Sequence, residues 1–245
     1  MIPIRDIERW HESAHYRKKS DWVCIDQPKV IKEWLPKHAL GQLLCAEGRE
    51  LPDWTSGYEC VQVSYDWLVG VTKKPSHPGV MAVFERPAYN VSNLMRCQSA
   101  LVLDGIQDPG NMGTIVRSMV AFGCQSLCLT SDCVDPFHPK AVGASSGAIG
   151  HIQGIYYEHH WKEWLSSTAM PVYVLDPLAC HSIWDVAPKP YVLVCGSEGR
   201  GIQSSLISSV SITPLSIPTS DHVESLNAAM SVSIALNKLS RGMHK

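Results

Sequence analysis

The segment from Leu101 to Gly123 constrains the fold of this chain more than any other part of the sequence. It begins with an apolar run at residues 100–103, which has the length of a buried strand. The Gly- and Pro-rich residues 104–110 then predict a tight loop, and from Met112 the apolar residues recur with the period of a helix. A strand, a loop and a helix in this order predict an α/β domain with a ligand site at the carboxyl end of its sheet.

Two polar residues in this segment are not required by such a fold. Asn111 stands at the expected helix cap, and Arg117 follows among the apolar residues of the helix. An arginine beside an apolar stripe is costly to bury unless it meets an anion or a hydrogen-bonding partner. Taken alone, the segment favours the simpler explanation, which is a capping asparagine and a solvated arginine. Two later segments change that balance.

Strand and helix signals alternate along the chain, with a break at residues 85–98 that contains Pro87. Short apolar runs predict strands at residues 22–25, 60–63, 172–175 and 191–195, among others. We therefore expect two domains: a small α/β domain over residues 1–90 and a second α/β domain over residues 97–245. In the second domain, the steady alternation predicts a mainly parallel sheet covered by helices on both faces.

Composition excludes several classes of protein. The 245 residues are 45% hydrophobic and 18% charged, which is typical of an ordinary globular protein. No apolar run is long enough for a membrane span, and the charged amino terminus lacks the core of a signal peptide. The nine cysteines are scattered without a CxxC pair, which favours reduced thiols over disulfides or zinc. The expectation is a cytoplasmic protein without a metal or a membrane partner.

Net charge also limits how the chain could bind a polyanion. The formal charge is −2 at pH 7, so the protein is not a bulk polycation. If it binds nucleic acid, local patches such as residues 16–19 and 73–74 must supply the positive charge. Each patch is equally consistent with a solvated surface.

Two later segments also place polar or glycine residues directly after an expected strand. In residues 191–202 an apolar run leads into Gly196-Ser197-Glu198-Gly199-Arg200-Gly201. Such glycines let the backbone approach a ligand and present N–H groups to it, although a plain glycine turn has the same pattern. In residues 216–241 Ile217-Pro218 ends a strand, and a helix rich in alanine and serine is expected over residues 225–239, beginning with Ser225-Leu226-Asn227. That helix is equally consistent with an ordinary amphipathic carboxyl end.

Together the three segments resemble the three signature motifs of the SpoU branch of the SPOUT methyltransferases. The first motif, N-x-G-x-x-x-R, corresponds to Asn111, Gly113 and Arg117. The second, G-x-E-G-x-G, corresponds to Gly196, Glu198, Gly199 and Gly201. The third corresponds to Ile217-Pro218 followed by Ser225-Leu226-Asn227, so the resemblance covers residues 100–241.

This resemblance implies a function and a fold. Proteins of this family transfer a methyl group from S-adenosylmethionine to a ribose 2′-hydroxyl of RNA. Their carboxyl region forms a deep trefoil knot, an exception to the rule against knots, and they act as homodimers. Residues 1–90 resemble the RNA substrate-binding domain of ribosomal-RNA members, which is similar to RNA-binding ribosomal proteins, so ribosomal RNA is the expected substrate. The alternatives are a transfer-RNA ribose methyltransferase and a catalytically silent RNA-binding or assembly protein that keeps the knot.

The resemblance also implies roles for individual residues. Gly196, Ile217 and Leu226 are expected to contact the cofactor. Arg117 is expected to be catalytic. Because a guanidinium pKa exceeds about 12, we favour a role as a hydrogen-bond donor to the 2′-oxygen over one as a base; a deprotonated guanidine is the alternative. There are four other candidate catalytic residues. Asn111 would orient Arg117, and Glu198 would hold either Arg117 or the substrate side of the loop. The roles of Ser225 and Asn227 are either structural or catalytic.

Overall fold

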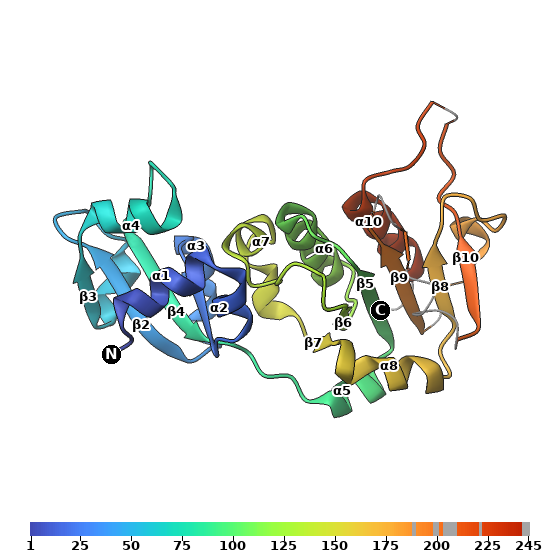
Figure 1. Ribbon diagram of the computed structural model, residues 1–245, viewed down its shortest axis with the longest axis horizontal. Coiled ribbons are helices and arrows are strands. Elements are labelled where there is room, and N and C mark those ends of the chain that lie inside the picture. The colour runs from blue at the N-terminus through green and yellow to red at the C-terminus, as the bar shows by residue number, and fades with distance from the viewer. Residues whose placement is uncertain (188–189, 198–200, 203–209, 221, 242–245) are drawn as a thin grey trace. The chain divides into compact units, whose positions relative to one another are not determined.

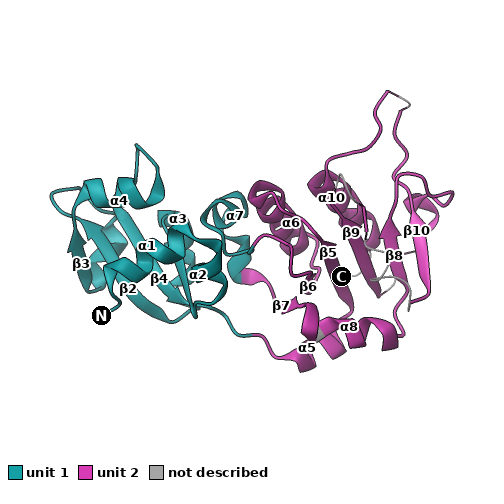
Figure 2. Ribbon diagram, viewed as in Figure 1, with its two compact units in different colours: residues 1–88, 135–150 teal, residues 89–134, 151–245 magenta. Residues whose placement is uncertain are grey.

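The computed structural model divides the chain into two compact units (Figures 1 and 2). Unit 1 contains residues 1–88 and 135–150, and unit 2 contains residues 89–134 and 151–245. Residues 135–150, which the sequence analysis assigned to the second domain, pack with unit 1. The structure describes residues 1–187, 190–197, 201–202, 210–220 and 222–241.

Unit 1 is built on a four-stranded mixed sheet in the order β1-β4-β2-β3. The strand β4 runs antiparallel to both of its neighbours, whereas β2 and β3 are parallel. The strands predicted at residues 22–25 and 60–63 are confirmed. The elements of this unit are α1 (Ile4–Glu12), α2 (Ala14–Lys18), β1 (Trp22–Ile25), α3 (Pro28–Trp34), β2 (Leu40–Ala46), the 3-10 helix η1 (Asp53–Gly57), β3 (Cys60–Val63), α4 (Tyr65–Thr72), β4 (Val80–Glu85) and α7 (Pro139–Ala144), followed by η2 (Ala148–His151).

Residues 135–150 belong to unit 1 because a buried ion pair and an aromatic contact hold them there. The Arg86 guanidinium donates to both carboxylate oxygens of Asp135, at 2.9 and 3.3 Å, and Arg17 Nε lies 3.9 Å from the same carboxylate. The side chain of Asp135 is only 1% exposed. Phe137 lies under the Arg86 guanidinium and meets the ring of Trp34 edge to face. A carboxylate buried in this way requires its cationic partners.

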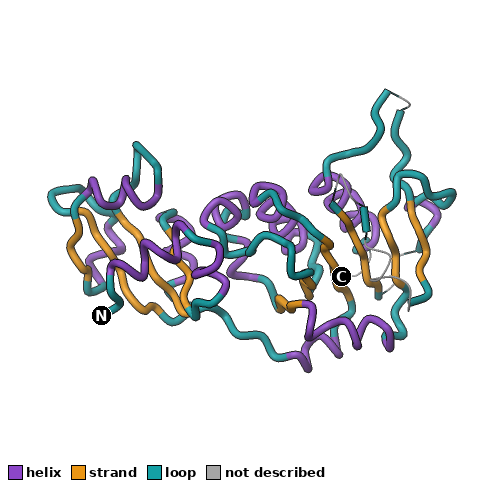
Figure 3. The backbone as a smooth tube through the Cα atoms, viewed as in Figure 1, coloured by secondary structure: helices purple, strands orange, loops and turns teal. Residues whose placement is uncertain are grey.

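Unit 2 contains a six-stranded sheet in the order β10-β8-β9-β5-β6-β7, and every neighbouring pair in it is parallel. Figure 3 shows the strands in orange and the helices in purple. The predicted α/β class and parallel sheet are therefore confirmed. The elements of this unit are α5 (Val91–Arg96), β5 (Ser99–Asp104), α6 (Pro109–Ala121), β6 (Ser126–Leu129), β7 (Gly154–Tyr157), α8 (Glu158–Ser167), β8 (Val172–Leu175), η3 (Ile183–Asp185), β9 (Tyr191–Gly196), β10 (Ile212–Leu215) and α10 (Ala228–Leu239).

Helices cover both faces of this parallel sheet (Figure 1). Successive strand residues point to opposite faces, so a strand buried on both sides is apolar throughout. One face packs against α5 and α8, and α6 and α10 cover the other. The cluster on the first face contains Leu94, Ala100, Val102, Cys128, Tyr156, Trp161, Trp164, Val172, Val174, Val192 and Val194.

Two helix starts differ from the predictions. The helix α6 begins at Pro109, and the Asp108 carboxylate caps it by accepting from the backbone N–H of Asn111 at 2.8 Å. The sequence analysis expected Asn111 to be the cap, but Asn111 lies in the first turn of the helix. Proline favours the first position of a helix because its missing N–H would be unpaired there. The helix α10 begins at Ala228, three residues later than expected, with Asn227 as its cap.

Burial keeps at least two of the cysteines protonated. All nine are free thiols, and seven are buried. Burial raises the pKa of Cys24 and of Cys124 to about 12, so both stay protonated at neutral pH.

In the described part of the chain no helix is long and apolar enough to cross a membrane.

Candidate active site

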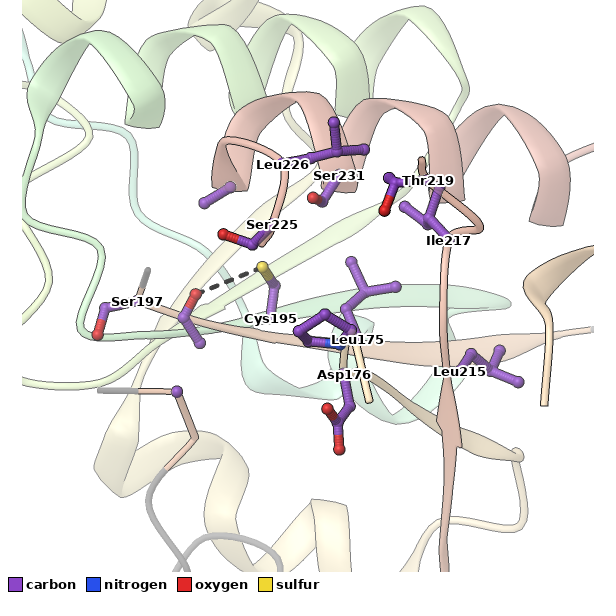
Figure 4. A pocket seen from close by; sticks show the side chains of 14 residues that line it. Leu175, Asp176, Cys195, Ser197, Leu215, Ile217, Thr219, Ser225, Leu226 and Ser231 are labelled. Atoms are coloured by element: carbon purple, nitrogen blue, oxygen red, sulfur yellow. Dashed lines mark hydrogen bonds between the residues drawn. The ribbon is translucent and has the colours of Figure 1, made fainter. Parts of the chain in front are cut away.

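A cavity of about 310 Å³ lies where β8, β9 and β10 end, beside the first turn of α10 (Figure 4). Its position follows the rule that parallel sheets bind ligands at the carboxyl ends of their strands. In Figure 4, Ser225, Leu226 and Ser231 lie on one side of the cavity and Asp176 lies on the other. The lining residues are Leu175, Asp176, Pro177, Cys195, Gly196, Ser197, Gly201, Leu215, Ile217, Thr219, Ser225, Leu226, Ala228 and Ser231.

The cavity brings together four residues that the sequence analysis selected from two separate segments. Gly196 ends β9, Ile217 follows β10, and Ser225 and Leu226 immediately precede α10. Gly196, Ile217 and Leu226, the three residues expected to contact a cofactor, thus line the same cavity. Glu198, between Ser197 and Gly201, lies outside the described residues.

Gly196 is the point at which the loop after β9 closes on itself. The backbone N–H of Gly201 donates to the carbonyl of Ser197 at 2.9 Å, and these two residues form an isolated antiparallel bridge. A Cβ atom at position 196 would lie 2.3 Å from the carbonyl oxygen of Gly201 and 2.8 Å from a side-chain carbon of Ile202. The backbone would therefore have to move to admit any side chain there.

A side-chain hydrogen bond joins the first motif to the third. Asn227 Nδ2 donates to Asn111 Oδ1 at 3.1 Å, across 116 residues of sequence. The Oδ1 atom of Asn227 accepts from the backbone N–H groups of Ala229 and Met230, at 3.0 and 3.4 Å. One amide therefore caps α10 and also ties it to the first turn of α6.

The model of the SpoU rRNA Methylase family matches residues 98–237, which is more than half of the chain. The chain belongs to the SpoU rRNA methylase family. The methyltransferase prediction drawn from the three motifs is confirmed.

Individual relatives of this SpoU methylase extend over both units. It is 24% identical to the 23S rRNA (guanosine(2553)-2′-O)-methyltransferase RlmP of Bacillus subtilis, over 96% of this chain and 95% of that protein. It is 30% identical to an uncharacterized tRNA/rRNA methyltransferase of Synechocystis, over 73% of this chain and 66% of that protein. The crystal structure of the SpoU methyltransferase AviRb from Streptomyces viridochromogenes, in complex with AdoMet, superposes with a TM-score of 0.86 at 22% identity, covering 98% of this chain and 97% of that one.

The cavity of this SpoU methylase fits S-adenosylmethionine (AdoMet), the methyl donor. Its volume is within the range of roughly 300–1,000 Å³ that small-molecule sites occupy. Leu175, Leu215 and Ile217 supply apolar walls suited to an adenine ring. The hydroxyl groups of Ser197, Thr219, Ser225 and Ser231 supply hydrogen-bonding partners for the polar ends of the molecule.

Arg117, the expected catalytic residue, lies on α6. It is an exposed residue of α6 and is not part of the cavity lining as far as the structure describes it. The side chain of Asn111, which was expected to orient Arg117, accepts a hydrogen bond from Asn227. Exposed guanidinium groups are common binding partners of phosphate in nucleic acids.

Sequence reasoning missed the wall formed after β8. Asp176 and Pro177 line the cavity, and Asp176 Oδ1 accepts from the backbone N–H of Leu178 at 2.9 Å. The strand at residues 172–175 was predicted, so the rule about carboxyl ends of strands could have selected Asp176 as well.

We expect Gly196→Ala to weaken AdoMet binding at least about tenfold, because the new methyl group forces the loop after β9 away from the cavity. Isothermal titration calorimetry would measure the dissociation constant. Gly57→Ala is the matched control, since a Cβ atom at position 57 meets nothing within 4 Å. Equal AdoMet affinity in Gly196→Ala and wild type would contradict this role for Gly196.

Proposed function

We propose that this SpoU methylase transfers the methyl group of AdoMet to a ribose 2′-hydroxyl of ribosomal RNA. The observation that carries the proposal is the meeting of Gly196, Ile217 and Leu226 in one cavity, tied through Asn227 to the helix that bears Arg117. The relative RlmP supports the 2′-O specificity. It is named as a 23S rRNA 2′-O-methyltransferase, and it aligns with nearly the whole chain.

In the proposed mechanism the bound donor supplies an electrophilic methyl group on a sulfonium. The cavity holds it, and the exposed Arg117 on α6 meets the RNA. As the ribose oxygen gains negative charge, the guanidinium of Arg117 donates a hydrogen bond to it and neutralises an adjacent phosphate. Such stabilisation is strongest in the transition state, which is where an interaction accelerates the reaction.

The other motif residues have supporting roles in this proposal. Asn111 and Asn227 hold the first turn of α6 against the cap of α10. Ser225 contributes a hydroxyl group to the cavity. The role expected for Glu198, toward Arg117 or the substrate side of the loop, concerns a residue outside the described part of the chain.

We also propose that the carboxyl region is knotted and that the protein acts as a homodimer. β10 lies at one edge of the sheet, yet the chain returns from it to place α10 against α6 and β9, which is the return path that a knotted end requires. Exposed apolar side chains on and before α10, Met230 at 54% and Val223 at 49%, supply a surface for a second copy.

Unit 1 is the proposed RNA substrate-binding domain. It is a compact unit with its own sheet and core. Its exposed cations include Lys19 and Arg49, and the Arg49 guanidinium lies 3.8 Å from the centre of the Tyr65 ring. Planar guanidinium and aromatic groups of this kind are used to bind RNA.

Mapping of ribose methylation in total RNA, from a strain with the gene and from one lacking it, tests the proposed function. The proposal expects one or a few 2′-O-methyl sites in ribosomal RNA to disappear in the deletion strain and to return when the gene is restored. A site lost from transfer RNA would favour the transfer-RNA alternative. An unchanged pattern would favour the catalytically silent RNA-binding protein.

A further inference from the structure

A second side-chain bond joins α6 to α10, and it lies outside the three motifs. Ser118 Oγ lies 2.6 Å from Ser233 Oγ, which is 115 residues away in sequence. Ser118 follows Asn111 by seven residues on α6, and Ser233 follows Asn227 by six residues on α10. At 1.5 Å per residue, the two bonds are spaced by about 10 Å along two helices that run in the same direction. Together they fix how far α6 can slide or tilt against α10.

Counting hydroxyl protons gives this bond a direction. The Ser233 hydroxyl donates to the carbonyl oxygen of Ala229, one turn earlier in α10, at 2.6 Å. A serine hydroxyl carries one proton but two lone pairs, so Ser233 can then only accept from Ser118. A chain of hydrogen bonds therefore runs from Ser118 through Ser233 to the backbone of the first turn of α10.

This chain connects the two parts of the proposed active site. Ser118 directly follows Arg117 on α6. The first turn of α10 contributes Ala228 and Ser231 to the cavity lining. Residues beside the bond, including Met119, Val232 and Ala229, are buried and apolar. Apolar contacts are not directional, whereas a hydrogen bond tolerates only a narrow range of distance and angle.

We propose that Ser118 and Ser233 are a positioning pair for methyl transfer, which keeps the helix that bears Arg117 in register with the helix that lines the cofactor cavity. The inference rests on the proposed function of Arg117 and the cavity. Neither serine touches the substrate or the cofactor. Their effect is transmitted through α6, and small displacements of a reacting group have large effects on rate.

The test uses Ser118→Ala, Ser233→Ala and the double variant in the full-length protein. We expect kcat for methyl transfer to ribosomal RNA to fall about tenfold in each, because the register of α6 is relaxed. The dissociation constant for AdoMet should stay within about twofold of wild type, since the cavity lining is retained. The double variant should be no slower than the slower single variant, because both changes break one shared interaction.

Ser240→Ala is the matched control. The Ser240 hydroxyl makes the same kind of bond, to the carbonyl of Leu236 one turn earlier at 2.7 Å, near the end of α10. It should leave kcat unchanged. A kcat within twofold of wild type in both single variants would overturn the proposal. It would also be overturned if the affinity of these variants for AdoMet fell by the same factor as kcat.

Amide hydrogen exchange over residues 109–121 is measured on the same variants. It shows whether loss of the Ser118–Ser233 bond loosens α6, and it needs no substrate. Faster exchange in α6 is expected in Ser118→Ala and Ser233→Ala but not in Ser240→Ala. Unchanged exchange would overturn the proposal even if wild type proves inactive. A wild-type protein that methylates no ribosomal RNA, with α6 loosened in the variants, would instead count against the proposed function.

Discussion

Arg117→Ala is expected to lower kcat for methyl transfer by about 10²–10³-fold, because it removes a preorganised donor aimed at the developing charge, an interaction worth about 2.7–4 kcal/mol. AdoMet binding and the folded state should be preserved, since Arg117 is exposed on α6 and does not contribute to the cavity lining that the structure describes. Single-turnover kinetics with labelled AdoMet would measure the chemical step, and calorimetry would measure cofactor binding.

Two further variants sharpen this experiment. Arg117→Lys retains the positive charge but loses the planar fork, so we expect it to recover only part of the rate. Thr114→Ala changes an exposed residue one turn earlier on the same helix and should have wild-type kinetics. A kcat for Arg117→Ala within a factor of two of wild type would remove Arg117 from the mechanism.

Asp135→Asn is expected to cost unit 1 about 3–5 kcal/mol of folding free energy, because it leaves buried cations without their counter-charge. The Arg86 and Arg17 side chains are 15% and 6% exposed, and both face this one carboxylate. Hydrogen exchange measured by mass spectrometry at increasing urea concentration would report the stability of the two units separately.

An exposed ion pair in the same unit provides the control. Lys73 Nζ lies 3.7 Å from Glu12 Oε1, with side chains that are 75% and 56% exposed. Lys73→Ala should change the stability by no more than about 1 kcal/mol, because solvent screens such pairs. If Asp135→Asn cost as little as Lys73→Ala, the ion pair would not be what attaches residues 135–150 to unit 1.

Much of the fold and part of the site could be predicted because local signals were sufficient. Short apolar runs bounded by Gly, Pro or polar residues gave the strands at residues 172–175 and 191–195. The resemblance to the SpoU methyltransferases implied that Gly196, Ile217 and Leu226 contact one cofactor, and parallel strands end at one edge of a sheet. The structure places Gly196, Ile217 and Leu226 in one cavity accordingly.

The remaining features depend on partners far away in sequence. Asp135 carries no local signal that Arg86, 49 residues earlier, will be its partner. The sequence analysis therefore placed residues 135–150 with the second domain, whereas they pack with unit 1. Asp108 and Asn111 are both good capping residues, and only the proline at position 109 distinguishes them. The hydrogen bond between Ser118 and Ser233 joins two unremarkable serines whose meeting depends on the packing of α6 on α10.

Transfer of a labelled methyl group in vitro tests the account most directly. The purified protein is incubated with methyl-labelled AdoMet and ribosomal RNA from the deletion strain, and the RNA is digested to nucleosides and analysed by mass spectrometry. The account predicts label in a single kind of 2′-O-methylnucleoside, with wild-type protein but not with Arg117→Ala. Label on a base, or no transfer by a wild-type protein that binds AdoMet, would contradict it.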